Sequence, residues 1–217
     1  MRIDLHMHTF LSDGELLPIE LARRAAVMNH EAIAFTDHAS LSNLEDIISK
    51  CTKDAILAEE YGLKVLPGVE ITHVPPSKIS EVSEKAKKMG AKIVVIHGET
   101  ISEPVAPGTN HASVVCEYVD ILAHPGFITE DDAKLAADNG IALEITSRPS
   151  HALTNGHVAA VAKKYGANMV VDTDTHSPKD LITEERAIQI AMGAGLSNSE
   201  AEKCVYDIPK SLVRKLI

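Results

Sequence analysis

The chain of 217 residues has few aromatic residues, few cysteines and no long apolar run. Aromatic residues make up only 3% and tryptophan is absent, so we do not expect a stacking platform for single-stranded nucleic acid. The three cysteines stand far apart without a C-x-x-C spacing, which excludes a zinc knuckle and favours reduced thiols in a cytoplasmic protein. No apolar run approaches the roughly 20 residues that span a bilayer, and we expect no signal peptide.

Positive charge is also scarce. Lysine and arginine number 21 against 31 acidic residues, which gives a formal net charge of -10. An acidic chain repels the backbone of nucleic acids and the surface of anionic membranes. We therefore expect neither a nucleic-acid polymer nor a membrane as a partner. A small phosphorylated substrate could still bind if metal ions supply the positive charge.

A repeated pattern of a short apolar run followed by a helical stretch organises the whole chain. The runs that predict strands are Ile3–His8, Ala32–Asp37, Lys64–Ile71, Lys92–His97, Val119–His124, Ile141–Ile145 and Met169–Asp174. Most of them are apolar throughout, which indicates strands covered on both faces in a parallel sheet. The regular βα repeat predicts an α/β fold in one domain, residues 1–217. It favours a closed or nearly closed barrel, although the spacing also permits a doubly wound sheet.

Helix start and stop signals fill the stretches between these runs. The predicted helices are Pro18–Met28, Glu81–Met89, Asp131–Asn139, Gly156–Tyr165, about Lys179–Met192, and a short last one that begins at Asn198–Lys203. Asn155 is expected to cap the fourth of these. Residues 43–60, 100–113 and 147–154 are expected to be loops that contact the substrate.

Eleven histidines are present, and many of them stand where a predicted strand ends, together with acidic residues. In a parallel barrel these ends converge on one mouth, where active sites lie. Residues i and i+2 of a strand point to the same side, so His6 with His8, and Asp174 with His176, can share a metal ion. Imidazole and carboxylate ligands suit zinc, manganese or iron.

The segments DLHMHTFLSDG, FTDH, PGVE, HGE, AHPG and DTDTHS resemble the PHP (polymerase and histidinol phosphatase) family, in family order from residue 3 to about residue 180. The resemblance implies a distorted, TIM-like (β/α)7 barrel with three divalent metal ions. It implies three ligand groups: His6, His8, Glu70 and Asp174; Glu70 again with His97 and His124; and Asp13, His38 and His176. Glu70 would then bridge two ions.

Other polar residues have less specific signals. Arg148 follows the sixth strand and is a candidate bidentate phosphate clamp, with a salt bridge at the rim as the alternative. His111, at a probable helix start, is a candidate substrate contact or a solvated residue. Asp37 and Glu144 are expected to orient other groups, and Glu99 to make a loop hydrogen bond. The histidines expected at the surface or in ordinary structural roles are His30, His73, His151 and His157.

The function favoured by these features is a metal-dependent, histidinol-phosphatase-like hydrolase of a small phosphomonoester. A metal-bridging hydroxide would attack phosphorus, with the metal-bound water acting together with Glu70 and His176. No cysteine or serine stands in a nucleophile motif. The alternatives are a phosphodiesterase or nuclease acting on nucleotides, nucleoside bisphosphates or nucleic-acid ends, and a non-catalytic barrel stabilised by metal. An amide or lactone hydrolase is disfavoured, because Lys64 and Lys92 begin their strands, at the wrong end for a bridging carbamate.

Overall fold

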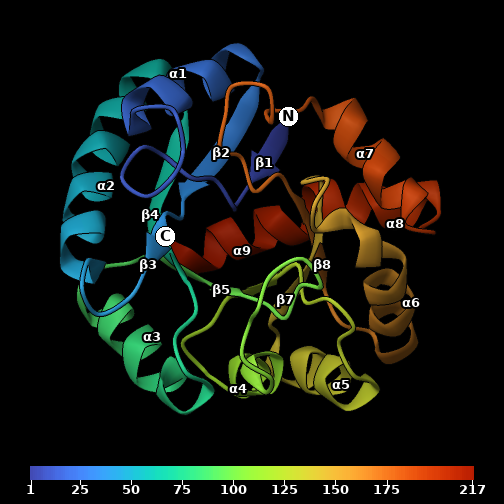
Figure 1. The fold of residues 1–217 in the computed structure, drawn as a ribbon. Helices are drawn as coiled ribbons and strands as arrows, with labels where there is room; N and C mark the ends of the chain where they lie inside the picture. The colour runs from blue at the N-terminus through green and yellow to red at the C-terminus, as the bar shows by residue number, and fades with distance from the viewer.

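A computed structural model describes residues 1–217 and contains one parallel sheet. Its strands are β1 (Arg2–Asp4), β2 (His30–Phe35), β3 (His38–Ala39), β4 (Lys64–Ile71), β5 (Ile93–His97), β6 (Ile121–Ala123), β7 (Ala142–Thr146) and β8 (Met169–Asp172). They follow one another in the order β1-β2-β4-β5-β6-β7-β8, and β3 pairs with β4 beyond the end of β2. Because β2 and β3 share one position, the sheet has seven positions in a nearly closed barrel (Figure 1). The prediction of a TIM-like α/β barrel is confirmed.

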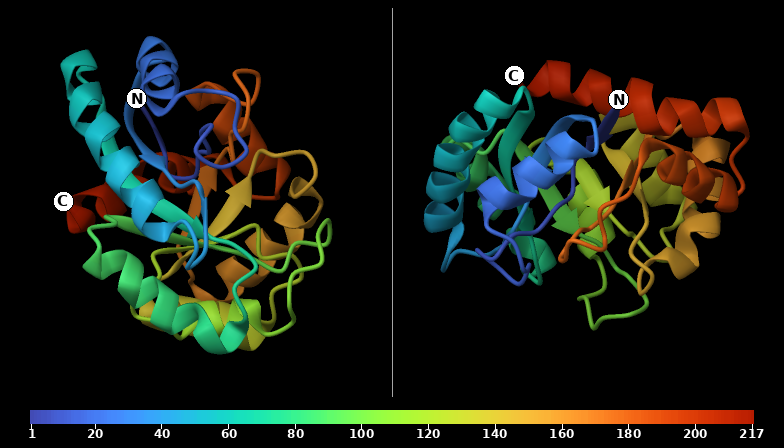
Figure 2. Two further views of the ribbon diagram at one scale, coloured as in Figure 1. Left: turned by 60° about the vertical axis from the view of Figure 1, so that its left-hand side comes forward. Right: turned by 90° about the horizontal axis from the view of Figure 1, so that it is seen from above.

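Helices surround this sheet and also cross one of its ends (Figures 1 and 2). They are α1 (Pro18–Val27), α2 (Leu44–Ala58), α3 (Ile79–Lys88), α4 (Thr109–Val114), α5 (Glu130–Asn139), α6 (Asn155–Tyr165), α7 (Glu184–Gly193), α8 (Asn198–Glu202) and α9 (Ile208–Leu216). A π-helical turn joins α8 to α9, and short 3-10 turns precede α3 and α6 and follow α2. None of the helices combines the length and the apolar composition that crossing a bilayer requires.

Two of the expectations about local structure that were wrong concern helices. Residues 43–60, expected to be a substrate loop, are largely helix α2, which packs on β4 outside the barrel. Asn155 does not cap α6 but is its first residue. Its side-chain amide instead pairs with both backbone groups of Thr146, at 3.2 Å and 2.8 Å, and so ties the start of α6 to the end of β7.

Two buried carboxylates join β1 to β8, where no continuous ladder forms. Asp172 Oδ1 accepts a hydrogen bond from the Leu5 N–H at 2.7 Å, and Asp4 Oδ1 accepts one from the Thr173 N–H at 3.2 Å. The buried Arg2 guanidinium pairs with Asp4 at 2.8 Å. These side chains satisfy backbone groups that would otherwise be buried without a partner.

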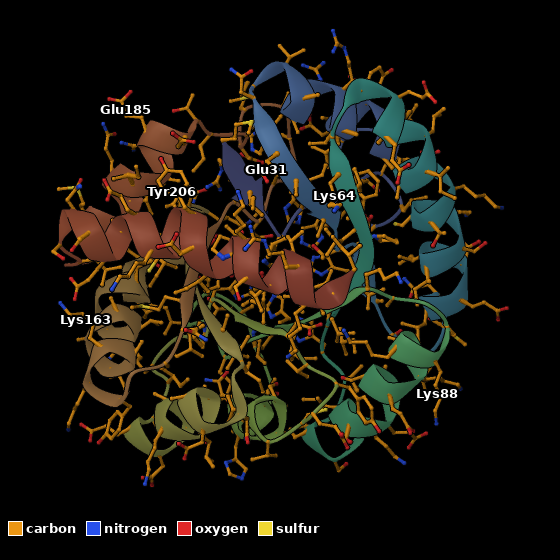
Figure 3. The ribbon with its side chains drawn as sticks, turned by 180° about the vertical axis from the view of Figure 1, so that it is seen from behind. Glu31, Lys64, Lys88, Lys163, Glu185 and Tyr206 are labelled. Atoms are coloured by element: carbon orange, nitrogen blue, oxygen red, sulfur yellow. The ribbon has the colours of Figure 1, made fainter.

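The apolar core has two parts, separated by the sheet. The larger part, 48 buried residues, includes side chains of the strands and of the surrounding helices. The smaller part, 13 residues, contains strand residues such as Leu66 and Val95 together with Leu212 and Val213 of α9. Helix α9 therefore closes the base of the barrel, the end where the strands begin; in Figure 3 it crosses this end beside Glu31 and Lys64. The short last helix predicted from Asn198 continues through the π-helical turn to Leu216.

Candidate metal centre

The first histidine pair lies just beyond β1, at the mouth where the strands end. Met7 forms an isolated bridge with Thr175, the His8 N–H donates to the Thr175 carbonyl at 2.8 Å, and the Asp174 N–H donates to the His6 carbonyl at 2.9 Å. The two Nε2 atoms of His6 and His8 are 3.0 Å apart. The pair thus converges on one point as predicted, although the pairing with Thr175, rather than a continued strand, positions it.

Glu70, at the end of β4, is fully buried and lies at the centre of the mouth. Its Oε1 is 3.3 Å from His6 Nε2 and 3.6 Å from His124 Nε2. Its Oε2 is 2.7 Å from His38 Nδ1 and 3.6 Å from His8 Nε2. This one carboxylate therefore contacts members of all three predicted ligand groups.

The group Asp13, His38 and His176 lies on the solvent side. Asp13 Oδ1 is 3.2 Å from His176 Nε2, and Asp13 Oδ2 is 3.6 Å from His38 Nε2. The Asp13 side chain is 54% exposed, whereas most of the other predicted ligands are buried. The mouth therefore opens to solvent beside this group.

The loop that carries Asp13 is held by Asp37, which is buried behind it. The Asp37 carboxylate accepts hydrogen bonds of 2.7 to 3.1 Å from the backbone and hydroxyl groups of Thr9 and Ser12. Four bonds to one carboxylate fix the loop between β1 and α1. The structure thus gives Asp37 the orienting contacts expected of it.

The group His97 and His124 is positioned by two glycines in the next loops. The two rings are 4.6 Å apart. A Cβ added to Gly98 would lie 2.2 Å from the Ala123 carbonyl oxygen, so only glycine fits this close approach of the loops after β5 and β6. Gly126 has a φ of +59° and is equally enclosed.

Left-handed backbone conformations occur at two of the predicted ligands. His124 has a φ of +28° and Asp174 has a φ of +52°. Non-glycine residues rarely adopt such angles, and they cluster at functional sites. Both residues were predicted to end regular strands, but β6 stops at Ala123 and β8 at Asp172. The turned backbone, rather than strand alternation, places His124 Nε2 3.6 Å from Glu70 Oε1 and Asp174 Oδ1 3.2 Å from His8 Nε2.

Glu144 supports two of the histidines from below. Its Oε1 lies 3.0 Å from His6 Nδ1, and its Oε2 accepts a hydrogen bond of 2.8 Å from the His124 N–H. A carboxylate that accepts the Nδ1 proton leaves the Nε2 lone pair of the ring free for a metal ion. Glu144 therefore makes the orienting contact expected of it.

The electrostatics of the cluster favour bound positive charge. Burial alone would raise the pKa of Glu70, but the neighbouring His6, His38 and His97 hold it well below its usual range. Burial works against the charged form of His38, yet Glu70 and Asp13 raise its pKa to about 10. The pKa is raised for His6, His38 and His124, whose protons balance the carboxylates, whereas burial lowers it for His8 and His97. Divalent ions can replace the protons of the first three.

The residues present fit the metal ions that the family resemblance implies. Glu70 Oε1 is buried without a hydrogen-bond partner, a costly arrangement that coordination would relieve. Imidazole and carboxylate side chains that could hold an ion form four overlapping groups: His8, Asp13, His38 and His176; His97, His124 and His151; His6, His124 and Glu144; and His6, His8 and Glu70. This donor set suits zinc, manganese or iron.

The two predicted substrate contacts lie in different surroundings. Arg148 Nη1 donates to the Asp174 carbonyl at 3.1 Å and is 2.9 Å from His176 Nδ1, so the guanidinium lies at the edge of the cluster. His111 is apart from the cluster: it is exposed, and its Nδ1 is 2.8 Å from Asp132 Oδ1.

Two residues at the mouth were not predicted there. His151, expected at the surface, is 3% exposed, and its ring stacks on that of His124 at 4.3 Å. Glu103 was not singled out, yet its Oε2 is 3.2 Å from His97 Nε2. Both lie on loops that follow strands, β7 and β5. Neither residue stands at a strand end, so the strand pattern does not indicate them. Their place in loops that leave the mouth is the signal that could have identified them.

The other histidines make ordinary contacts or lie at the edge. His30 is buried near the base, where its Nδ1 is 3.1 Å from the Ala25 carbonyl oxygen, and His157 Nε2 is 2.8 Å from the Ile128 carbonyl oxygen. His73 lies near the cluster, with its ring 5.2 Å from that of His97. Glu99 makes the expected loop hydrogen bonds, accepting from backbone N–H groups at the start of α4.

Comparison with known proteins agrees with this geometry. A family profile described as PHP domain matches residues 4–166. The chain belongs to the PHP domain family. It is 48% identical to an uncharacterized protein of Methanocaldococcus jannaschii, with both chains covered completely. It is 27% identical to Ribonuclease P protein component 3 of Methanosarcina mazei, over 94% of this chain and 85% of that protein. It is 24% identical to the 5'-3' exoribonuclease Rnm of Escherichia coli, over 99% of this chain and 69% of that protein.

Solved structures share the PHP fold at low sequence identity. An archaeal Ribonuclease P with mature tRNA contains a chain with a TM-score of 0.68 and 18% identity, over 97% of this chain and 91% of that one. A histidinol phosphate phosphatase of Lactococcus lactis, complexed with zinc, L-histidinol and phosphate, gives 0.62 and 17%, over 90% and 94%. At these identities the likeness concerns the fold alone.

The expectation that no nucleic-acid polymer is a partner was wrong. Several relatives are Ribonuclease P protein components, and the archaeal structure with tRNA has the same fold, which points to RNA. The expectation rested on the net charge of -10. Net charge averages the whole surface, whereas RNA contact depends on local groups and on positive charge at a metal site.

Proposed function

We propose that this PHP protein is a phosphatase that hydrolyses a phosphomonoester with three divalent ions, zinc, manganese or iron. The observation that carries this proposal is the convergence of eight side chains around Glu70. These nine residues, here called the mouth cluster, are His6, His8, Asp13, His38, Glu70, His97, His124, Asp174 and His176. The distances of 2.7 to 3.6 Å between Glu70 and four histidines support ligation of several ions through one bridging carboxylate.

The chemistry needs positive charge and an activated water. Divalent ions, when bound, neutralise phosphoryl oxygens and lower the pKa of a water ligand so that it can attack phosphorus. The chain itself supplies orientation: Glu144 fixes His6, and Asp37 fixes the loop of Asp13. Arg148 offers a guanidinium at the solvent side that can bind two phosphoryl oxygens.

A cavity next to Arg148 supports an anionic substrate. It has a volume of about 350 Å³ and is lined by Arg148, Lys179 and Arg186 together with hydroxyl-bearing residues of the strand ends. None of the nine cluster residues lines this cavity, and Arg148 is its link to the cluster. Three cations against one acidic residue, Asp180, make it attractive to a phosphorylated group in an otherwise acidic protein.

A second candidate is an exonuclease that releases nucleotides from an RNA end. The relatives named Ribonuclease P component and exoribonuclease support it. So do two exposed aromatic rings on loops that follow strands: Phe10 is 54% and Phe127 is 67% exposed, although the chain has only three phenylalanines. Exposed rings beside a phosphate site can stack on bases.

The products separate the two candidates. Chelated protein would be reloaded with Mn²⁺, Zn²⁺ or Fe²⁺ and incubated with small phosphomonoesters and with a 5'-phosphorylated oligoribonucleotide. A phosphatase releases inorganic phosphate, whereas an exonuclease releases mononucleotides. Glu70→Gln, prepared in the same way, controls for contaminating enzymes. Failure of the loaded protein to cleave any of these esters would refute both candidates.

A further inference from the structure

A carboxylate from outside the mouth cluster lies among three of the histidines. Glu103 is carried by the loop between β5 and α4. Its Oε2 is 3.2 Å from His97 Nε2 and 3.5 Å from His73 Nε2, and its Oε1 is 3.6 Å from His151 Nε2. A loop side chain that is 40% exposed thus contacts two buried imidazoles, His97 and His151, and the exposed ring of His73.

His151 is held with one ring nitrogen facing this group. The other nitrogen, Nδ1, is 2.7 Å from the hydroxyl oxygen of Thr100. An Nδ1–H that donates to Thr100 leaves Nε2 with a free lone pair directed toward Glu103, which is how proteins fix the tautomer of a metal-binding histidine.

The ring nitrogens of His151, His97 and His124 lie within 4.8 Å of one another. The buried Glu70 Oε1 is 3.6 Å from His124 Nε2, and the more exposed Glu103 Oε2 is 3.2 Å from His97 Nε2. Three imidazoles and one or two carboxylates are a donor set that suits zinc, manganese or iron.

We propose that His151 and Glu103 are additional ligands of the ion held by Glu70, His97 and His124. This inference rests on the metal centre of the proposed function, but it concerns the binding of one ion rather than the reaction. With two more protein ligands, this ion has fewer positions open to water than an ion held by three. It is therefore the most firmly retained of the ions, and the loop between β5 and α4 is fastened to the mouth through it.

Metal retention tests the proposal without any need for activity. Zinc-loaded wild type and variants would be dialysed against increasing concentrations of EDTA, and the ions per chain counted by elemental analysis. We expect one wild-type ion to resist removal longest. In His151→Ala and in Glu103→Gln, the EDTA concentration that removes this ion should be lower by roughly ten- to a hundredfold.

Three further variants make the outcome specific. Thr100→Val keeps His151 but removes the partner of its Nδ1, so we expect a smaller shift in the same direction. His151→Gln is the alternative should the alanine variant not fold. His157→Ala removes a histidine whose Nε2 is 2.8 Å from the Ile128 carbonyl oxygen and whose ring is 5.4 Å from that of Phe127, and it should retain zinc as wild type does.

The absorption spectrum of the cobalt-loaded protein gives an independent readout. Removal of a nitrogen ligand should change the intensity and position of the cobalt bands in His151→Ala but not in His157→Ala. Retention and spectra of His151→Ala and Glu103→Gln identical to wild type would overturn the proposal. They would leave the phosphoesterase proposal intact, because that is judged by the products of hydrolysis.

Discussion

The two ends of the barrel differ in what they bury. At the base, Leu212 and Val213 of α9 cover apolar strand residues, and buried polar groups are few: Arg2 pairs with Asp4 through Nη2 but leaves Nε and Nη1 without a hydrogen-bond partner. At the mouth, imidazoles and carboxylates are buried together, and Glu70 Oε1 has no hydrogen-bond partner. Apolar burial stabilises the fold directly, whereas buried polar groups without partners destabilise it. The comparison indicates that apolar packing at the base contributes stability, whereas the mouth concentrates carboxylates and imidazoles that bound cations would stabilise.

The backbone shows the same division. Near the base, helices α5 and α6 end at Gly140 and Gly166, whose φ angles of +71° and +75° cost a glycine little. At the mouth, left-handed angles fall on His124 and Asp174. Asn29, in the turn after α1, also has a left-handed φ, of 60°, and Gly126 has one at the mouth. The mouth is distinguished because two predicted metal ligands adopt such angles there, which is typical of functional sites.

Replacement of Glu70 by glutamine should have the largest effect and separates the two ends most clearly. It removes a charge from the centre of the mouth cluster, so we expect a loss of bound metal and a fall in kcat of more than roughly a thousandfold. Elemental analysis and steady-state kinetics measure the two effects. Glu99→Gln, which alters only loop hydrogen bonds, is the matched control and should cost far less. A fully active Glu70→Gln protein would contradict the assignment.

Shortening a core side chain at the base of the barrel should lower stability and leave metal binding and activity unchanged. Leu212→Ala removes a buried side chain from the interface of α9 with the strands, and we expect a loss of about 2 to 4 kcal/mol in the free energy of unfolding. Urea unfolding of the metal-free protein measures this. Metal content and kcat at a temperature where the variant is folded should stay those of wild type. A loss of metal in the folded variant would mean that the two ends are coupled.

At the solvent side of the mouth, Arg148→Met should lower kcat/KM by roughly ten- to a thousandfold, the scale of a lost charge-assisted contact of about 1.5 to 4 kcal/mol. Arg148→Lys should recover only part of the lost kcat/KM, since the lysine ammonium cannot bind two phosphoryl oxygens in the bidentate manner of a guanidinium. Metal content is the critical companion measurement, because Arg148 Nε is also 3.4 Å from Asp174 Oδ2. Reduced metal content would make Arg148 a residue that positions Asp174 instead of a substrate contact.

A smaller effect is expected on the pH dependence of stability, through His30 near the base of the barrel. Burial lowers the pKa of His30 to about 4, below the value of about 6.5 expected in the unfolded chain. As the pH falls from about 6.5 to 4, the unfolded chain takes up a proton that the native protein does not, so stability is lost over this range. His30→Gln should reduce that loss by about 1 to 3 kcal/mol. Urea unfolding of both proteins at pH 7 and pH 5 measures how far the free energy of unfolding falls between the two pH values. An equal fall in wild type and His30→Gln would rule out this role.

Much of the fold followed from local pattern, because each strand and helix has its own sequence signal. The strand Lys64–Ile71 has the predicted bounds, and its apolar run is terminated on both sides by polar residues. The first strand is shorter than predicted: it ends at Asp4, and the segment with His6 and His8 is joined to the sheet only by an isolated bridge between Met7 and Thr175. The closure of the base by α9 depends on contacts between distant segments, which periodicity does not report.

The candidate metal site was predictable from the residues to the extent that they lie at or just past strand ends, whereas the grouping of the ligands into three sets, and Asp13 in the loop after β1, came from the family resemblance alone. The structure brings all nine predicted ligands together, whereas His151 and Glu103 reach the same place from loops whose course the sequence does not indicate. Net charge misled for a similar reason: it is a sum over the surface and does not locate the cations near Arg148. Position, rather than composition, decides what the mouth can bind.

The most direct test of the account is the rate of phosphate-ester hydrolysis by chelated protein as Mn²⁺ is added back in known molar ratios. The account predicts that hydrolysis is absent from the metal-free protein, rises with added Mn²⁺ and reaches a plateau near three ions per chain, and that Glu70→Gln shows no such rise. Hydrolysis that is undiminished after complete removal of metal, or a loaded protein that cleaves no phosphate ester, would contradict it.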